Sequence, residues 1–248
     1  MVMRQIAAVS GGSSGIGQAV VAGLVEDGYR VAFSGRSYSK IQALMSDINR
    51  HKVGVTGVVS DARDEGHASG LFALAQRTFS AWPNVYVACA GQGFPGTLLR
   101  SSDIEWEAFV RLNLLGVMHQ MRETAQMFSS NTERPCDLVV IGAASARSLP
   151  EMDPVFASIK AALHALVESL RREVCPHGIR VTLIEPGFVV SGFQKAAGYD
   201  PKWFTQIERD HGRLLQPRDV AKVVRFIIQQ PLHVHIDDVR IRPTGQPI

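Results

Sequence analysis

Cysteine is scarce in this chain of 248 residues, which holds only Cys89, Cys136 and Cys175. These three cysteines form no CxxC pair, so the sequence indicates neither a disulfide framework nor a cysteine-based metal site. We therefore expect a protein of a reducing compartment that binds no metal ion.

The chain also lacks an excess of charge of either sign, because 26 basic residues are nearly balanced by 23 acidic ones. A formal net charge of +3, without any basic run, argues against a nucleic-acid partner. The apolar runs are too short to span a bilayer, and Met1–Arg4 lead straight into a strand-like run, which fits no signal peptide. We expect a cytoplasmic protein with no membrane partner.

Glycine, by contrast, gathers near the N-terminus in the segment Ser10-Gly11-Gly12-Ser13-Ser14-Gly15-Ile16-Gly17. A strand-like run (Ile6–Ser10) precedes this turn, and an amphipathic helical pattern (Ile16–Asp27) follows it. Such a unit presents backbone N–H groups and a helix N-terminus to an anionic phosphate. Glycine is needed there because a Cβ would block the close approach of a pyrophosphate. The segment predicts a dinucleotide-binding turn, and an ordinary glycine-rich loop is the alternative.

Strand-like and helical patterns alternate along the whole chain. The strand-like runs are Ile6–Ser10, Val31–Ser34, Val53–Val59, Val85–Ala88, Leu138–Ile141, Val181–Ile184 and Val239–Ile241. The helical patterns are Ile16–Asp27, Lys40–Arg50, Glu65–Ala81, Asp103–Phe128, Pro154–Cys175 and Pro217–Gln229. Continuous apolar strands are typical of a parallel sheet that is buried on both faces. We predict an α/β fold with a single Rossmann-like, doubly wound parallel sheet of about seven strands and helices on both faces.

The chain contains no linker, repeat or low-complexity tract, so we predict one domain over residues 1–248. The segment Gly192–Leu215 is less periodic and follows the sixth strand-like run, where α/β sheets build their ligand crevices. We interpret residues 192–215 as a substrate lid, and a plain surface excursion is the alternative.

Several motifs occur together in an order and spacing typical of one enzyme family. The glycine turn matches the pattern TGxxxGIG, with Ser10 in place of threonine. Asp61 follows the third strand, Cys89-Ala90-Gly91 matches NAG, Asn113 lies on a helix, and Pro186-Gly187 with Ser191 matches PGxxxT. Over nearly its whole length the chain resembles the short-chain dehydrogenase/reductase family, and in particular its NADP-dependent carbonyl and oxoacyl reductases.

The resemblance implies a nicotinamide dinucleotide cofactor. In the family pattern Asp61 would contact the adenine and Asn113 would hold a catalytic water. The cofactor-binding residues expected in this chain are Gly11, Ser13, Ser14, Ile16, Gly17, Arg36, Asp61, Ala62, Ala90, Gly91, Lys160, Pro186, Gly187, Val189 and Ser191.

Arg36 decides the expected choice of cofactor. It directly follows the second strand, where a carboxylate would bind a ribose 2′-hydroxyl and an arginine accepts a 2′-phosphate. A guanidinium can hold a phosphate through two parallel hydrogen bonds. We therefore expect NADP(H) in preference to NAD(H), and a solvated arginine at a helix start is the alternative.

The chain departs from the family pattern at the catalytic residues. The family uses a serine, a YxxxK helix motif and an asparagine, and the motif here reads Phe156-Ala157-Ser158-Ile159-Lys160. Phe156 stands at the tyrosine position and Ala143 at the serine position, whereas Asn113 and Lys160 are retained. Neither Phe156 nor Ala143 can donate a proton or a hydrogen bond from its side chain. Ser145, two residues further on, is a possible substitute for the missing serine.

Two functions remain open. The first is an NADP(H)-dependent oxidoreductase for ketone or alcohol hydride transfer, disabled by Tyr→Phe and Ser→Ala changes, which we favour as deliberate removal of two hydroxyls. The alternative is a natural pseudoenzyme, or a diverged non-reductase that binds NADP(H) without tyrosine-dependent proton transfer. A pure interaction protein on the same fold would bind no dinucleotide.

The expected partners are a small carbonyl or alcohol substrate and further copies of the chain. The resemblance implies a homodimer or homotetramer paired through Asp103–Phe128 and Pro154–Cys175. Candidate pocket residues are Gln92, Gly93, Phe94, Ser145, Arg147, Phe188, Phe193 and Trp203, and their aromatic rings favour an apolar or ring-containing substrate.

Overall fold

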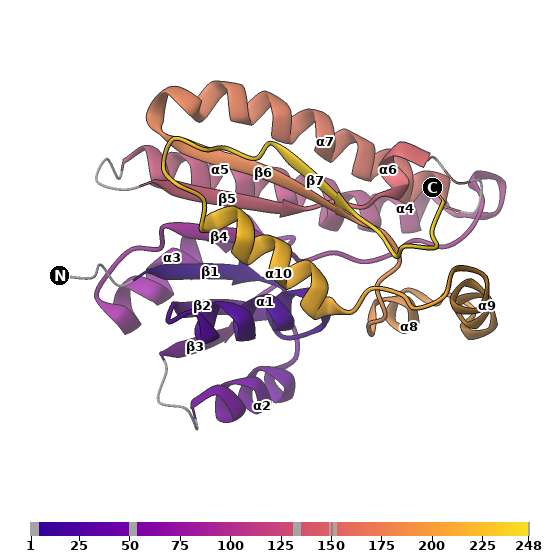
Figure 1. The fold of residues 1–248 in the computed structure, drawn as a ribbon, viewed down its shortest axis with the longest axis horizontal. Coiled ribbons are helices and arrows are strands. Elements are labelled where there is room, and N and C mark those ends of the chain that lie inside the picture. The colour runs from indigo at the N-terminus through magenta and orange to yellow at the C-terminus, as the bar shows by residue number, and fades with distance from the viewer. Residues whose placement is uncertain (1–4, 50–53, 131–134, 149, 151–152, 248) are drawn as a thin grey trace.

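A computed structural model describes residues 5–49, 54–130, 135–148, 150 and 153–247. Its centre is one seven-stranded parallel sheet in the order β3-β2-β1-β4-β5-β6-β7 (Figure 1). The strands are β1 (Ile6–Ser10), β2 (Arg30–Gly35), β3 (Val55–Val59), β4 (Val85–Ala88), β5 (Cys136–Ile141), β6 (Ile179–Pro186) and β7 (Asp238–Ile241). The predicted doubly wound fold is therefore confirmed.

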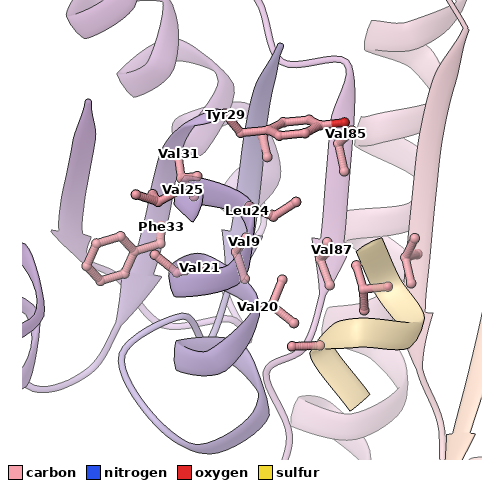
Figure 2. Close-up of a cluster of buried hydrophobic side chains, with 14 of the residues drawn as sticks. Val9, Val20, Val21, Leu24, Val25, Tyr29, Val31, Phe33, Val85 and Val87 are labelled. Atoms are coloured by element: carbon pink, nitrogen blue, oxygen red, sulfur yellow. The ribbon is translucent and has the colours of Figure 1, made fainter. Parts of the chain in front are cut away.

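Helices cover both faces of the sheet. One face carries α1 (Gly15–Glu26), α2 (Tyr38–Asn49) and α10 (Pro217–Ile228), and the other carries α3 (His67–Phe79), α5 (Gly116–Ser129) and α7 (Pro154–Val174). On the first face, Val20, Val21 and Leu24 of α1 pack on the strand residues Val9 and Val87 (Figure 2). Strands enclosed in this way have no polar face, which explains their continuous apolar runs.

The expected strands are confirmed, with small differences at their ends. β6 extends beyond the predicted Val181–Ile184 on both sides, because Ile179 and Arg180 pair with β5 and Pro186 pairs with β7. Val53 and Arg50, which the predictions placed in a strand and a helix, lie outside the described residues.

The prediction of one regular helix over Asp103–Phe128 is wrong. α4 (Asp103–Val110) passes into a π-helical turn at Arg111–Leu115 and then into α5. A π turn inserts one extra residue without breaking the rod, so the apolar pattern continues through it. The pattern Glu65–Ala81 is too long, because Gly66 and Ser80 adopt left-handed backbone angles at the two ends of α3.

The less periodic segment 192–215 contains two helices, α8 (Phe193–Ala197) and α9 (Pro201–His211). Gly198 separates them with a φ of 80°, and Asp200 caps α9 by accepting a hydrogen bond from the Lys202 N–H. Both helices, together with the short α6 (Ser145–Ser148), lie beyond the strand carboxyl ends (Figure 1). Within the described ranges, no helix combines the length and apolarity needed to cross a bilayer.

Candidate functional site

The site lies where the strand order reverses. β1 is flanked by β2 and β4, so the connections that leave β1 and β4 pass to opposite faces and open a crevice at their carboxyl ends. Ser10, the last residue of β1, holds the start of the next loop, because its Oγ accepts hydrogen bonds from the N–H groups of Cys89 (3.1 Å) and Ala90 (3.3 Å). The serine that replaces threonine in the family pattern thus ties the glycine turn to the β4 loop.

The glycine turn is too crowded for side chains at two positions. Gly11 has a φ of 67°, and a Cβ there would lie 2.8 Å from the Ala90 Cα. A Cβ on Gly17 would collide with the carbonyl oxygen of Gly11. Ser14 precedes α1 without any side-chain hydrogen bond to its first turn among the described residues. A bare helix N-terminus under a tight backbone cradle fits a pyrophosphate.

Ser13, Ile16 and Gly17 keep the cradle close to the sheet. The Ser13 side chain is buried against Gly35 at the end of β2, where a Cβ would overlap its Oγ. Ile16 packs against the core that α1 shares with α10. These contacts place the first turn of α1 directly over the carboxyl ends of β1 and β2.

A buried histidine that sequence reasoning missed lies at the carboxyl ends of β2 and β3. Its Nε2 lies 3.0 Å from the Oγ of Ser34 on β2, and its Nδ1 lies 2.9 Å from the Oγ of Ser60, so His67 joins the ends of two strands. Burial lowers the pKa of His67, which favours the neutral ring. Arg36, next to this bridge, is exposed beyond β2.

Asp61 already has a partner. Arg63 donates to its carboxylate from Nε (3.0 Å) and Nη2 (2.6 Å), and this pairing lowers the pKa of Asp61. The expected adenine contact must therefore share the carboxylate with Arg63 or use nearby backbone. Ala62 is buried, and its carbonyl accepts a hydrogen bond from the Gln120 side chain at 3.1 Å.

The π-helical turn positions Asn113, which is fully buried. Its Oδ1 accepts from the Gln92 N–H at 3.1 Å, and its Nδ2 donates to the Phe109 carbonyl at 3.2 Å. A Cβ on Gly91 would lie 3.1 Å from that Oδ1 and 3.8 Å from the Nζ of Lys160. Gly91, Asn113 and Lys160 therefore converge, although they come from three different elements.

The segment after β6 returns to the glycine turn. Pro186 accepts a hydrogen bond from the Ala144 N–H at 2.8 Å, and the Gly187 N–H donates to Ile241 at 2.8 Å. Val189 is buried, and its carbonyl accepts from the Gln194 side chain. Ser191 ends the segment with its Cβ 3.6 Å from the position that a Cβ on Gly15 would take. Among the predicted cofactor residues of this segment, Ser191 thus faces the predicted phosphate turn.

Lys160 is buried with its Nζ donating to the Ile141 carbonyl at 3.2 Å. Desolvation lowers the pKa of Lys160 to about 8. The ammonium lies 5.7 Å from the centre of the Phe156 ring, one helical turn earlier. Phe156 and Ala143 are both buried and pack with Phe109, so apolar carbon fills the two positions where the family pattern has hydroxyls.

Three other polar side chains near the site have different surroundings. The Ser145 Oγ is buried and has no hydrogen-bond partner among the described residues. Arg147, an expected pocket residue, instead donates to the buried Glu185 at 2.8 Å and to Asp238 at 3.3 Å. Arg147 is therefore part of an ion-pair cluster beside β6 and β7. Burial also raises the pKa of the Cys89 thiol to about 12, so this thiol stays protonated.

Aromatic rings form a continuous series across the site, which we call the aromatic row. The ring centres of successive members lie 5.0–6.4 Å apart in the order Phe94, Phe109, Phe156, Phe193, Tyr199, Trp203 and Phe188. The expected pocket aromatics are thus brought together, and the row joins segment 192–215 to α4 and α7. Tyr199 also donates a hydrogen bond to Asp153 at 3.3 Å. Sequence reasoning missed both partners, because 46 residues separate them.

The arrangement can hold a dinucleotide but shows no metal centre. No group of three His, Cys, Asp or Glu side chains suited to a metal ion occurs in the described parts of the chain. The glycine cradle, the bare N-terminus of α1 and the buried Lys160 fit an extended anionic ligand that ends near Phe156.

Comparison with known proteins identifies the family. The model of the family described as short chain dehydrogenase matches residues 5–202. An uncharacterized oxidoreductase of Staphylococcus aureus (strain MW2) is 27% identical over 239 residues, which cover 96% of this chain and 97% of the relative.

Two solved structures are also similar in fold. An NADPH-bound short-chain oxidoreductase of Pseudomonas aeruginosa PAO1, described as containing an atypical catalytic center, is 25% identical with a TM-score of 0.86, covering 98% of this chain and 97% of that one. An alcohol dehydrogenase of the archaeon Thermococcus sibiricus, complexed with 5-hydroxy-NADP, is 24% identical with a TM-score of 0.84, covering 99% of both chains. With the family match spanning most of the chain, this protein belongs to the short-chain dehydrogenase family of oxidoreductases.

Proposed function

We propose that this protein is an NADP(H)-dependent oxidoreductase that transfers hydride to or from a small molecule, without the tyrosine and serine that assist proton transfer in the family pattern. The observation that carries the proposal is the convergence of Gly91, Asn113 and Lys160 beside Phe156 at the switch point of the sheet. The residues proposed for the cofactor half of the site are all present, whereas both hydroxyl positions hold carbon.

Three features support NADP(H) as the cofactor. The glycine cradle and the N-terminus of α1 suit the pyrophosphate, and Arg36, exposed directly after β2, would bind the 2′-phosphate. Several solved relatives hold NADP+, NADPH or a derivative of NADP. The residues from Pro186 to Ser191 and Lys160 would hold the nicotinamide riboside between them.

Each side chain has a separate role in this proposal. When bound, the nicotinamide ring supplies or accepts hydride. Lys160 orients the ribose, and Asn113 holds the β4 loop through the Gln92 N–H. The Phe156 ring shields the reacting centre from water but gives no proton to a carbonyl oxygen. Reduction of ketones is therefore slow, unless water or Ser145 stabilises the developing oxyanion.

The catalytic positions fit natural divergence as well as deliberate removal of two hydroxyls. The Phe156 ring packs between two other rings of the aromatic row. Its centre lies 6.2 Å from that of Phe109 and 6.1 Å from that of Phe193. The Pseudomonas aeruginosa relative is also described as containing an atypical catalytic center. We further propose that residues 1–248 form one domain, with residues 192–215 as a lid attached through the aromatic row.

Arg36→Ala is expected to weaken NADPH binding by about 10- to 150-fold, which corresponds to the loss of a charge-assisted phosphate contact of ~1.5–3 kcal/mol. Binding of NADH should change little, because NADH lacks the 2′-phosphate. Fluorescence titration of both cofactors measures the two dissociation constants. Arg77→Ala, which removes another exposed arginine from α3, is the matched control. Equal affinity of the unaltered protein for NADPH and NADH would contradict the assignment of Arg36.

The protein is expected to form a homodimer or homotetramer through α5, α7 and the π-helical turn between α4 and α5. Leu115 and Met118 are 40% and 39% exposed on the outer side of this rod, although both are large and apolar. Light scattering at micromolar concentration tests this assembly, and Met118→Glu should lower the measured mass. A strictly monomeric mass of the unaltered protein would contradict the expectation.

A further inference from the structure

Asp153 occupies a helix-capping position without capping the helix. It directly precedes α7, where an aspartate normally accepts hydrogen bonds from N–H groups of the first turn. Its side chain instead accepts from the Tyr199 hydroxyl through Oδ2, at 3.3 Å, and makes no capping bond among the described residues. Oδ1 is buried and has no hydrogen-bond partner in the described part of the chain. A buried carboxylate oxygen without a partner is costly, so a ligand is expected to satisfy it.

The tyrosine that holds this carboxylate belongs to the aromatic row. Tyr199 stacks on Trp203 with ring centres 5.4 Å apart and on Phe193 with centres 6.4 Å apart, and Phe193 contacts Phe156. The faces of such rings attract organic cations. Burial raises the pKa of Asp153 to about 6, while the hydrogen bond from Tyr199 opposes that shift, so the carboxylate is mostly ionised at about pH 7.5.

The missing hydroxyls restrict which acceptor reacts easily. When a carbonyl carbon gains hydride, its oxygen becomes negative and needs a proton or a hydrogen-bond donor. Phe156 and Ala143 offer neither, and both are packed with apolar carbon. An iminium group (C=N⁺) is positive at the start and becomes neutral on gaining hydride, so it needs no donor at these positions. It does need a counter-charge in the bound state, and Asp153 supplies a negative one.

We propose that the substrate reduced at this site is an organic cation of the iminium class, held by the Asp153 carboxylate and the aromatic row. The inference rests on the proposed function, since hydride comes from the reduced nicotinamide. The iminium carbon forms one new C–H bond, the C=N π bond breaks, and its electron pair becomes the nitrogen lone pair. A neutral amine and the oxidised nicotinamide result, with no proton taken up.

The first test measures binding without turnover. The full-length protein is titrated with an N-methyl dihydroisoquinolinium salt, and with tetralone as a neutral ketone of similar shape, by calorimetry or by quenching of tryptophan fluorescence. Asp153→Asn should weaken binding of the cation at least about tenfold and leave tetralone binding within about twofold. Asp200→Asn is the matched control, because Asp200 is exposed and caps α9 in the same segment, residues 192–215, that carries Tyr199. Equal loss of both ligands, or no loss of the cation, overturns the inference.

The second test follows NADPH oxidation with the same two compounds. The unaltered protein should reduce the iminium salt with a kcat/KM at least about 100-fold above that for tetralone. This factor is the smallest rate loss that ketone reduction is expected to suffer without acid catalysis. The double variant Ala143→Ser/Phe156→Tyr should shrink this ratio at least about tenfold by raising tetralone turnover. If tetralone is preferred and Asp153→Asn abolishes its reduction, Asp153 is a proton donor and the inference is overturned.

The proposed function and the substrate inference fail in different ways. A protein that binds NADPH but neither binds nor reduces the iminium salt refutes the substrate inference and leaves the proposed function standing. A protein that binds no NADPH refutes the proposed function itself, and the inference falls with it.

Discussion

The double variant Ala143→Ser/Phe156→Tyr is expected to reduce simple ketones ~100- to 10,000-fold faster than the unaltered protein. The change restores a phenol beside Lys160, whose ammonium lies 5.7 Å from the ring centre, and a hydroxyl where Ala143 packs against Phe156. Both groups would face the oxygen that becomes negative as its carbon gains hydride. NADPH oxidation across a panel of carbonyl compounds gives the rates, and NADPH affinity should stay within about twofold.

Phe226→Tyr is the matched control for this experiment. It adds a phenol on α10, where Phe226 is 57% exposed and belongs to neither the aromatic row nor the helix that carries Lys160. Its ketone turnover should stay near that of the unaltered protein. High ketone turnover by the unaltered chain would show that another residue supplies the proton and would contradict the role given to position 156.

The single variants separate the two positions. If Phe156→Tyr alone restores most of the rate, then Ser145, whose hydroxyl is buried without a partner among the described residues, or a water fills the serine role. If only the double variant is active, Ala143 stands at the true serine position. The effects need not add, because the two groups act on one oxygen as a unit.

Arg180→Met is expected to lower the free energy of unfolding by ~3–5 kcal/mol, because it leaves a buried carboxylate without its counter-charge. Arg180 and Asp137 are neighbours on β6 and β5, are 7% and 3% exposed, and form two hydrogen bonds of 2.7 and 2.8 Å. Arg180 also donates to the carbonyls of Gln230 and Val234 after α10, each at 3.0 Å. Urea unfolding at constant protein concentration measures the loss.

Two further variants test the cause of this loss. Asp137→Leu combined with Arg180→Met should lose less stability than Arg180→Met alone, since no buried charge is left unpaired. Arg172→Met is the surface control, because Arg172 pairs with Glu168 while 73% of its side chain is exposed, and exposed pairs contribute little. A loss equal to that of the surface control would show that the buried pair does not support the sheet.

The sequence by itself determined the sheet and the glycine turn. The inner strands β1 and β4 are nearly continuous apolar runs, and burial on both faces of a parallel sheet requires such runs locally. β1 and β4 have the ends that their residues predict, Ile6–Ser10 and Val85–Ala88. Gly11 and Gly17 could be identified from the turn pattern, because Gly11 takes a φ of 67° and a Cβ on Gly17 would meet the Gly11 carbonyl oxygen of the same turn. Lys160 and Asn113 followed from the spacing of the family motifs.

Only the tertiary structure decided which side chains meet at the strand ends. The Asp153–Tyr199 pair spans 46 residues, Arg147 pairs with Glu185 away from the aromatic row, and His67 joins Ser34 to Ser60 across two strands. The π turn at Arg111–Leu115 was equally hidden, because one added residue leaves the apolar pattern of the rod unchanged. Local residue preferences fix strands, turns and helix starts, whereas hydrogen bonds between distant side chains depend on how the finished layers pack, which no local pattern encodes.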